Sequence, residues 1–211
     1  MHSRALDSLR QYLSDPVLQL STRGLEVMSK SKDPYHDVTH AERMLQDFSF
    51  MLKKDEHLLS MINPEVVVLS ICWHDSWKAG RLARNNLELL YHQFWDGLGS
   101  VRIFERAAKT AHLKAELRSE VSYSIRKHAH FQFLPIRTLE AKILRDLDDL
   151  DLWSQERISR GKGIFAFASA WRVKIFRRTI LNQKLNTDWA YAEREKRSLS
   201  FLEYFDALFQ K

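Results

Sequence analysis

Apolar residues recur at spacings of three and four along the segment that follows Asp37. This period brings an apolar side chain to the same face at every helical turn, so it indicates a helix with one buried face. The positions that carry the pattern are Val38, Met44, Leu45, Phe48, Met51 and Leu52. We therefore predict an amphipathic helix from about residue 37.

A second helix is predicted to start at Asn63. Asn is a favourable cap and Pro64 suits the first helical position. The residues that follow, 66–71, are almost entirely apolar, which predicts a central, buried helix. The same run leads directly into His74 and Asp75. An ionisable pair at the end of the most apolar segment needs an explanation beyond packing.

Few residues interrupt regular structure, since the 211 residues include only six Gly and four Pro. The chain is therefore predicted to be an all-α, single-domain helical bundle over residues 1–211, with a core at about 20–160 and a C-terminal helical pair at about 163–209. Further helices are predicted over Leu98–His112, Leu113–His130, Thr138–Leu147, Leu150–Ser159, Phe165–Gln183 and Trp189–Phe209.

Composition limits the kinds of site that this bundle can carry. Cys72 is the single cysteine, so a metal site would use His and carboxylate ligands. The longest apolar run, Val66–Trp73, is too short to cross a bilayer, and we expect a cytoplasmic protein without a membrane partner. The net charge of +6 favours anions, either phosphate-bearing small molecules, nucleic acid or acidic membranes. Neither the choice among these nor the oligomeric state follows from charge.

Three groups of ionisable residues carry candidate chemistry. His74 and Asp75 are adjacent, and imidazole with carboxylate suits Mn²⁺, Fe²⁺, Co²⁺, Ni²⁺ or Zn²⁺. His36 and His40 are one helical turn apart and share a face. A carboxylate cluster lies within a later helix, at Asp146, Asp148, Asp149 and Asp151. Taken singly, the groups also have structural explanations: a buried His beside a helix-end Asp, surface histidines and a solvated turn.

Together the groups resemble the HD-domain superfamily of metal-dependent phosphohydrolases, whose pattern is a His, then a His-Asp pair, then a distant Asp within a helical bundle. His40 with Arg43 is similar to the His-x-x-Arg helix of that superfamily, and His74-Asp75 is similar to its eponymous pair. The stretch 146–151 resembles its Asp-Ala-Asp-Arg-Leu-Asp segment, although Asp149 stands where Arg is common. Residues 124–128 resemble its Ile-x-x-His stretch.

The resemblance implies a divalent metal ion (Mn, Fe, Co, Ni, Zn or Mg) held by His40, His74, Asp75 and Asp148. It implies that a metal-activated water cleaves a phosphate ester or phosphoanhydride, which we expect to belong to a nucleotide. In this scheme Asp75 orients or deprotonates the water. Asp146 and Asp151 would support the ligands or cap helices.

Residues near the proposed site receive further roles. Lys78 is the first candidate to contact the phosphoryl group, ahead of Arg81, Arg84 and Lys127, and His128 is a candidate to protonate the leaving group or bind phosphate. Alternatively, Lys78 is a solvated helix-end lysine and His128 a buried structural histidine. A second metal ion would use His36 and Glu105.

Two other functions compete with hydrolysis. The first is a catalytically silent HD module that binds or senses a nucleotide. The second is a basic helical protein that binds nucleic acid, for which the excess of Lys and Arg in the last fifty residues is the only support.

Overall fold

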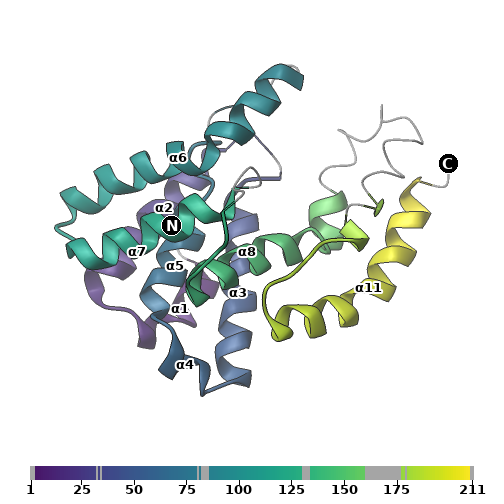
Figure 1. Ribbon diagram of the computed structural model, residues 1–211, viewed down its shortest axis with the longest axis horizontal. Coiled ribbons are helices and arrows are strands. Elements are labelled where there is room, and N and C mark those ends of the chain that lie inside the picture. The colour runs from purple at the N-terminus through teal and green to yellow at the C-terminus, as the bar shows by residue number, and fades with distance from the viewer. Residues whose placement is uncertain are drawn as a thin grey trace.

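The computed structural model describes residues 3–31, 33, 35–79, 81, 86–129, 134–159, 177–178 and 180–209. All regular structure in these residues is helical, which confirms the predicted fold class. Figure 1 shows α11 beside a bundle made of the preceding helices. Among the described helices, none has the length and apolar content needed to span a membrane. The main elements are α1 (Arg4–Asp7), a 3₁₀ turn (Arg10–Tyr12), α2 (Asp15–Met28), α3 (Val38–Lys54), α4 (Leu58–Met61), α5 (Pro64–Trp73), α6 (Asn86–Thr110), α7 (Ala115–His128), α8 (Leu139–Asp151) and α11 (Asp188–Phe209).

Helix α5 occupies the centre of the bundle and packs against α2, α3, α6, α7 and α8. Every side chain from Val66 to Trp73 is buried, as expected for a helix that is apolar on all sides. The Asn63 side chain accepts a hydrogen bond from the backbone N–H of Glu65, and Pro64 takes the first position. The predicted central helix is confirmed, and it delivers His74 and Asp75 to the interior.

Helix α3 places His40 on its buried face. The Asp37 side chain caps the helix by accepting hydrogen bonds from the backbone N–H groups of Thr39 and His40. Met44 and Phe48 follow His40 at four-residue intervals, and all three are fully buried. The cap therefore sets the start of the helix, and the apolar period turns the first-turn histidine inward.

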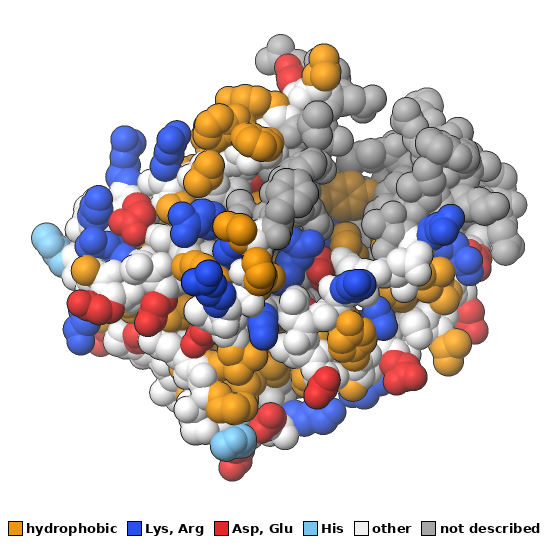
Figure 2. Space-filling model, viewed as in Figure 1, with side chains coloured by type: hydrophobic (Ala, Val, Ile, Leu, Met, Phe, Trp, Pro, Cys, Tyr) orange, Lys and Arg blue, Asp and Glu red, His pale blue; other side chains and the backbone are white. Residues whose placement is uncertain are grey.

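Helix α6 corrects the sequence prediction, because it begins at Asn86 rather than at Leu98. Gly97 and Gly99 lie inside this helix despite the low helix propensity of glycine. An added Cβ would lie 3.1 Å from the Arg126 carbonyl oxygen at Gly97 and 2.2 Å from the Trp77 ring at Gly99. Close packing thus explains both glycines. The first half of α6 also exposes apolar side chains, which appear in orange near the top of Figure 2: Leu87, Tyr91, Phe94 and Leu98.

Helix α8 also differs from the prediction, which broke it between Leu147 and Leu150. The helix continues without interruption to Asp151. Its buried carboxylates have partners within the bundle, for example Asp149 with Arg145 at 3.1 Å between Oδ2 and Nε, so the acidic cluster need not form a turn. As a result, Asp148 and Asp151 lie one turn apart on a face directed at α3.

The C-terminal part of the chain joins the bundle through its own contacts. A second apolar cluster packs residues that follow α8 against residues of α11: Trp153, Ile158, Ile180, Phe201 and Phe205. Arg197 of α11 pairs with Asp47 of α3 at 2.7 Å. The main apolar cluster extends from Leu6 to Leu147, so the N-terminal residues also pack on the core. The helix predicted over Phe165–Gln183 falls largely outside the described residues.

Candidate metal centre

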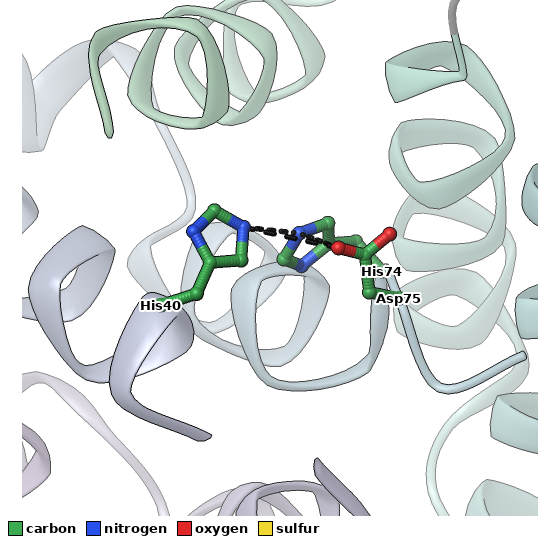
Figure 3. Close-up of side chains that lie close together, drawn as sticks. All are labelled: His40, His74 and Asp75. Atoms are coloured by element: carbon green, nitrogen blue, oxygen red, sulfur yellow. Dashed lines mark hydrogen bonds and ion pairs between the residues drawn. The ribbon is translucent and has the colours of Figure 1, made fainter. Parts of the chain in front are cut away.

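Two buried histidines face one another in the middle of the bundle. His40 comes from the first turn of α3, and His74 directly follows the last residue of α5. Their Nε2 atoms are 3.1 Å apart, and both side chains are fully buried. Figure 3 shows the His40 ring directed at the His74 ring and at the Asp75 carboxylate.

Hydrogen bonds on the other ring nitrogens fix which side of each imidazole faces the centre. His74 Nδ1 donates to the backbone carbonyl of Ile71 at 2.8 Å, and His40 Nδ1 donates to Asp151 Oδ2 at 2.6 Å. In the neutral state, both Nε2 atoms therefore present lone pairs to each other. Two lone pairs at this separation repel unless a proton or a metal ion lies between them, and a shared metal ion is one arrangement that satisfies both nitrogens.

Two carboxylates complete the cluster. Asp75 Oδ2 lies 3.2 Å from His74 Nε2, and Asp148 Oδ1 lies 3.3 Å from His40 Nε2. Among the described residues, Asp75 Oδ2 is a buried oxygen that accepts no hydrogen bond. A buried carboxylate oxygen without a donor is costly unless a cation compensates it. The four residues His40, His74, Asp75 and Asp148 are hereafter the His/Asp cluster.

The surroundings of the His/Asp cluster favour positive charge. Burial raises the pKa of Asp75, but its neighbours, the Lys78 ammonium first among them, outweigh it and hold this pKa well below its usual range. Burial and Arg157 oppose protonation of His40, yet Asp151 and Asp148 more than offset them and raise its pKa. Ionised carboxylates thus surround two ring nitrogens, and the site attracts a cation.

Three of the four residues predicted as metal ligands therefore meet at one place, and the fourth, Asp148, approaches one of them. The ligand atoms of these three, His40, His74 and Asp75, lie within 4.8 Å of one another. Asp148 reaches the same nitrogen of His40 and is 13% exposed, whereas the other three side chains are buried. Buried His and Asp groups at this spacing could hold a metal ion.

Asp151 supports the cluster from behind His40. Besides His40 Nδ1, it accepts hydrogen bonds from Arg43 Nε at 2.5 Å and from Arg157 Nη1 at 3.0 Å. These contacts hold the carboxylate that orients the imidazole. Asp146 has a different role, because it accepts hydrogen bonds from Asn186 and Thr187 and fixes the turn before α11.

Lys78 and His128 lie on the other side of Asp75. Lys78 Nζ is 2.9 Å from Asp75 Oδ1 and 2.8 Å from Asp96 Oδ2. His128 Nδ1 donates to the Ile125 carbonyl, which leaves Nε2 facing Asp96 Oδ2 at 3.3 Å. Burial lowers the pKa of His128, but hydrogen bonds to Asp75 and Asp96 outweigh it and raise this pKa to about 10.

Sequence reasoning missed Asp96 and Arg157. A signal for Asp96 exists, because Ser100 and Phe104 follow it at four-residue intervals and all three are buried. Extending the apolar period of α6 towards its N-terminus would have placed this carboxylate inside. Arg157 lies in a short stretch after α8, where no comparable apolar period predicts that its side chain is buried.

Two predicted residues, Glu105 and His36, do not join the cluster as ligands. Glu105 of α6 bonds to Ser122 of α7, 2.8 Å away, and pairs with Arg118. The His36 and His40 ring centres are 6.4 Å apart, and His36 Nδ1 bonds to Asp33. Among the described residues, neither Glu105 nor His36 belongs to a group of side chains whose ligand atoms lie close enough together to hold a metal ion.

The other candidate cations have partners elsewhere. Arg81 stacks 3.7 Å over the Trp77 ring and donates to the Trp77 carbonyl at 2.6 Å. Lys127 donates to the carbonyl of Leu134 at 3.3 Å. Arg84 lies outside the described residues. Of the four cations near the predicted pair, the structure therefore brings Lys78 to the Asp75 carboxylate.

Comparisons with family models, curated proteins and solved structures find no match to this chain. The resemblance to the HD-domain superfamily therefore stays a prediction, carried by the residues that suggested it.

Proposed function

We propose that this protein is a metal-dependent phosphohydrolase that cleaves a phosphate ester or phosphoanhydride of a nucleotide. One observation carries the proposal. Two imidazole nitrogens with fixed orientation converge in a buried site with a carboxylate oxygen that, among the described residues, accepts no hydrogen bond. The atoms come from segments that are 34 residues apart, and each ring is held by its own hydrogen bond. Such orientation is typical of metal ligands and has no evident packing purpose.

The His/Asp cluster would hold the ion, and its donor set suits Mn²⁺, Fe²⁺, Co²⁺, Ni²⁺ or Zn²⁺. When bound, a divalent ion would polarise a phosphoryl oxygen and acidify a water molecule. The pKa of Asp75 lies well below its usual range, which favours the carboxylate, and Asp75 follows the buried helix α5, so it can orient that water. Asp148, which is partly exposed, marks the side from which substrate would enter.

Cationic residues around the cluster supply charge for a phosphate group. The Lys78 ammonium has three N–H donors, of which two are directed at Asp75 and Asp96; within the described residues this leaves the third for a phosphoryl oxygen. His128 carries a second donor at Nε2 beside the same carboxylates. These positions agree with stabilisation of developing negative charge by Lys78 and with binding or protonation by His128.

The test is phosphate and pyrophosphate release from a broad nucleotide panel. Metal-stripped protein would be supplied in turn with Mn²⁺, Co²⁺, Ni²⁺ and Mg²⁺, and the wild type compared with Asp75→Asn. The matched control is Asp146→Asn, because Asp146 is also a buried aspartate but, in the described part of the chain, accepts its hydrogen bonds from the turn before α11. We expect metal-dependent release in the wild type and the control, and its loss in Asp75→Asn.

Other outcomes would separate the alternatives. Stoichiometric metal binding without turnover would favour a module that senses a nucleotide. Absence of metal binding would remove the basis of the proposal. Binding to DNA or RNA that weakens steeply with salt and needs no metal would favour the nucleic-acid alternative. Against that alternative, Figure 2 shows Lys and Arg side chains interspersed with acidic and apolar ones across the visible face.

A further inference from the structure

Asp75 faces two different environments with its two carboxylate oxygens. Oδ2 is directed at the His/Asp cluster, 3.2 Å from His74 Nε2. Oδ1 is directed away from it, 2.9 Å from Lys78 Nζ and 3.6 Å from His128 Nε2. The carboxylate therefore lies between two sites, in the manner of a group that bridges two cations.

The second of these sites has ligands for a metal of its own. Asp75, Asp96 and His128 are all buried, and one ligand atom from each lies within 4.8 Å of the others. They come from three parts of the bundle: the end of α5, the middle of α6 and the last residue of α7. We call these three residues the second cluster. Judged by ligand types alone, it is as suited to a divalent ion as the His/Asp cluster is.

A positive charge already occupies the second cluster. The Lys78 ammonium lies 2.9 Å from Asp75 and 2.8 Å from Asp96, so it neutralises both carboxylates at hydrogen-bond distance. Its side chain is only 13% exposed and is attached three residues after Asp75, which leaves it little room to withdraw. A divalent ion placed among the same oxygens would meet the ammonium at close range in a site with little water, and the two cations would repel strongly.

We propose that Lys78 is a built-in second cation, so that the protein holds one metal ion, at the His/Asp cluster, and excludes another from the second cluster. This inference rests on the metal site of the proposed function and adds the number of metal ions that the protein binds. The ammonium provides a fixed positive charge beside the reacting phosphate without a second metal. His36 and Glu105, the candidates that the sequence analysis named for a second ion, do not belong to the second cluster.

The experiment counts metal ions per chain. Full-length, metal-stripped protein is equilibrated with excess Mn²⁺, unbound ion is removed by gel filtration, and bound Mn²⁺ is measured by mass spectrometry. Electron paramagnetic resonance of the same samples reports whether two ions are coupled through a shared carboxylate. The variants are Lys78→Ser, which vacates the second cluster, and Lys78→Ser with Asp96→Asn, which removes one of its ligands.

The expected counts are one ion for the wild type, two coupled ions for Lys78→Ser and one for the double variant. Lys127→Ser is the matched control and should bind one ion, because Lys127 is another buried lysine but bonds to the Leu134 carbonyl. A folded Lys78→Ser protein that still binds one ion would overturn the inference and leave the proposed function intact. Two ions in the wild type would also overturn it, and this arm needs no variant to fold. No ion in the wild type would remove both proposals.

Discussion

Replacing Asp151 by Asn removes a negative charge behind His40 and keeps the size of the side chain. Asp151 Oδ2 is 2.6 Å from His40 Nδ1, and the same carboxylate binds Arg43 and Arg157. The negative charge of Asp151 holds the His40 ring in the orientation that directs Nε2 at the metal site. It also increases the electron density on Nε2 and so makes it a stronger metal ligand. Asp151→Asn should therefore weaken metal binding while leaving every ligand of the His/Asp cluster in place.

The magnitude follows from the kind of hydrogen bond that is lost. A hydrogen bond to a charged group contributes about 1.5–3 kcal/mol and a neutral one about 0.5–1.5 kcal/mol, so the exchange costs about 1–1.5 kcal/mol. An Asn that turns its NH₂ group towards His40 Nδ1 would lose the bond entirely. The two cases, a weakened and a lost hydrogen bond, correspond to a roughly 5–140-fold loss of affinity. This interval includes the roughly 10–100-fold loss that is typical when residues that orient metal ligands are replaced.

The assay is calorimetric titration of metal-stripped protein with Mn²⁺. Asp146→Asn is the control, because its loss affects Asn186 and Thr187 rather than His40. The control should bind Mn²⁺ within about twofold of the wild type but unfold more readily, by about 1–3 kcal/mol for its weakened hydrogen bonds. Circular dichroism would show that Asp151→Asn is folded. If the folded variant binds Mn²⁺ as tightly as the wild type, our reasoning about His40 is wrong.

Two further predictions concern the helix that delivers the site. Gly24→Ala should lower the free energy of unfolding by about 1–3 kcal/mol in calorimetry, since its Cβ would lie 2.7 Å from the Cys72 carbonyl oxygen and 2.8 Å from Trp73 Nε1. Because helix propensity alone favours Ala, an unchanged or higher melting temperature would contradict this close packing. Cys72 should react with thiol reagents only after unfolding. Burial raises its pKa to about 12, which leaves roughly a thousandfold less thiolate at pH 8 than its ordinary value of 9.0 would give. Rapid labelling of the native protein would count against a sealed core.

Much of the fold follows from local patterns in the chain. Asn63 and Pro64 predict the start of α5, and the apolar run that follows predicts its burial, because caps and period act over a few residues. The spacing after Asp37 similarly predicts α3 and one buried face along it, whereas it leaves open whether His40 in the first turn is buried. His40 lies in α3, and His74 and Asp75 directly follow α5, so the predicted helices already locate three of the four candidate ligands named from the sequence.

The bounds of α6 and α8 could not be predicted in the same way. Gly97 and Gly99 favour a break by propensity, but contacts with α7 and the Trp77 ring retain them within a helix. The carboxylates at the end of α8 resemble a solvated turn until His40, Arg43 and Arg145 are found beside them. In both cases the deciding partners come from distant parts of the chain.

The sequence by itself determined an all-helical fold, the helices that carry the candidate ligands and the order of those ligands along the chain. Tertiary structure alone decided that His40 Nε2 and His74 Nε2 lie 3.1 Å apart, that Asp151 supports His40, and that Lys78 lies between Asp75 and Asp96. The physical reason is the distance along the chain over which each interaction acts. Periodicity and capping reflect interactions between near neighbours, whereas the separation of two side chains on different helices depends on how the whole core packs.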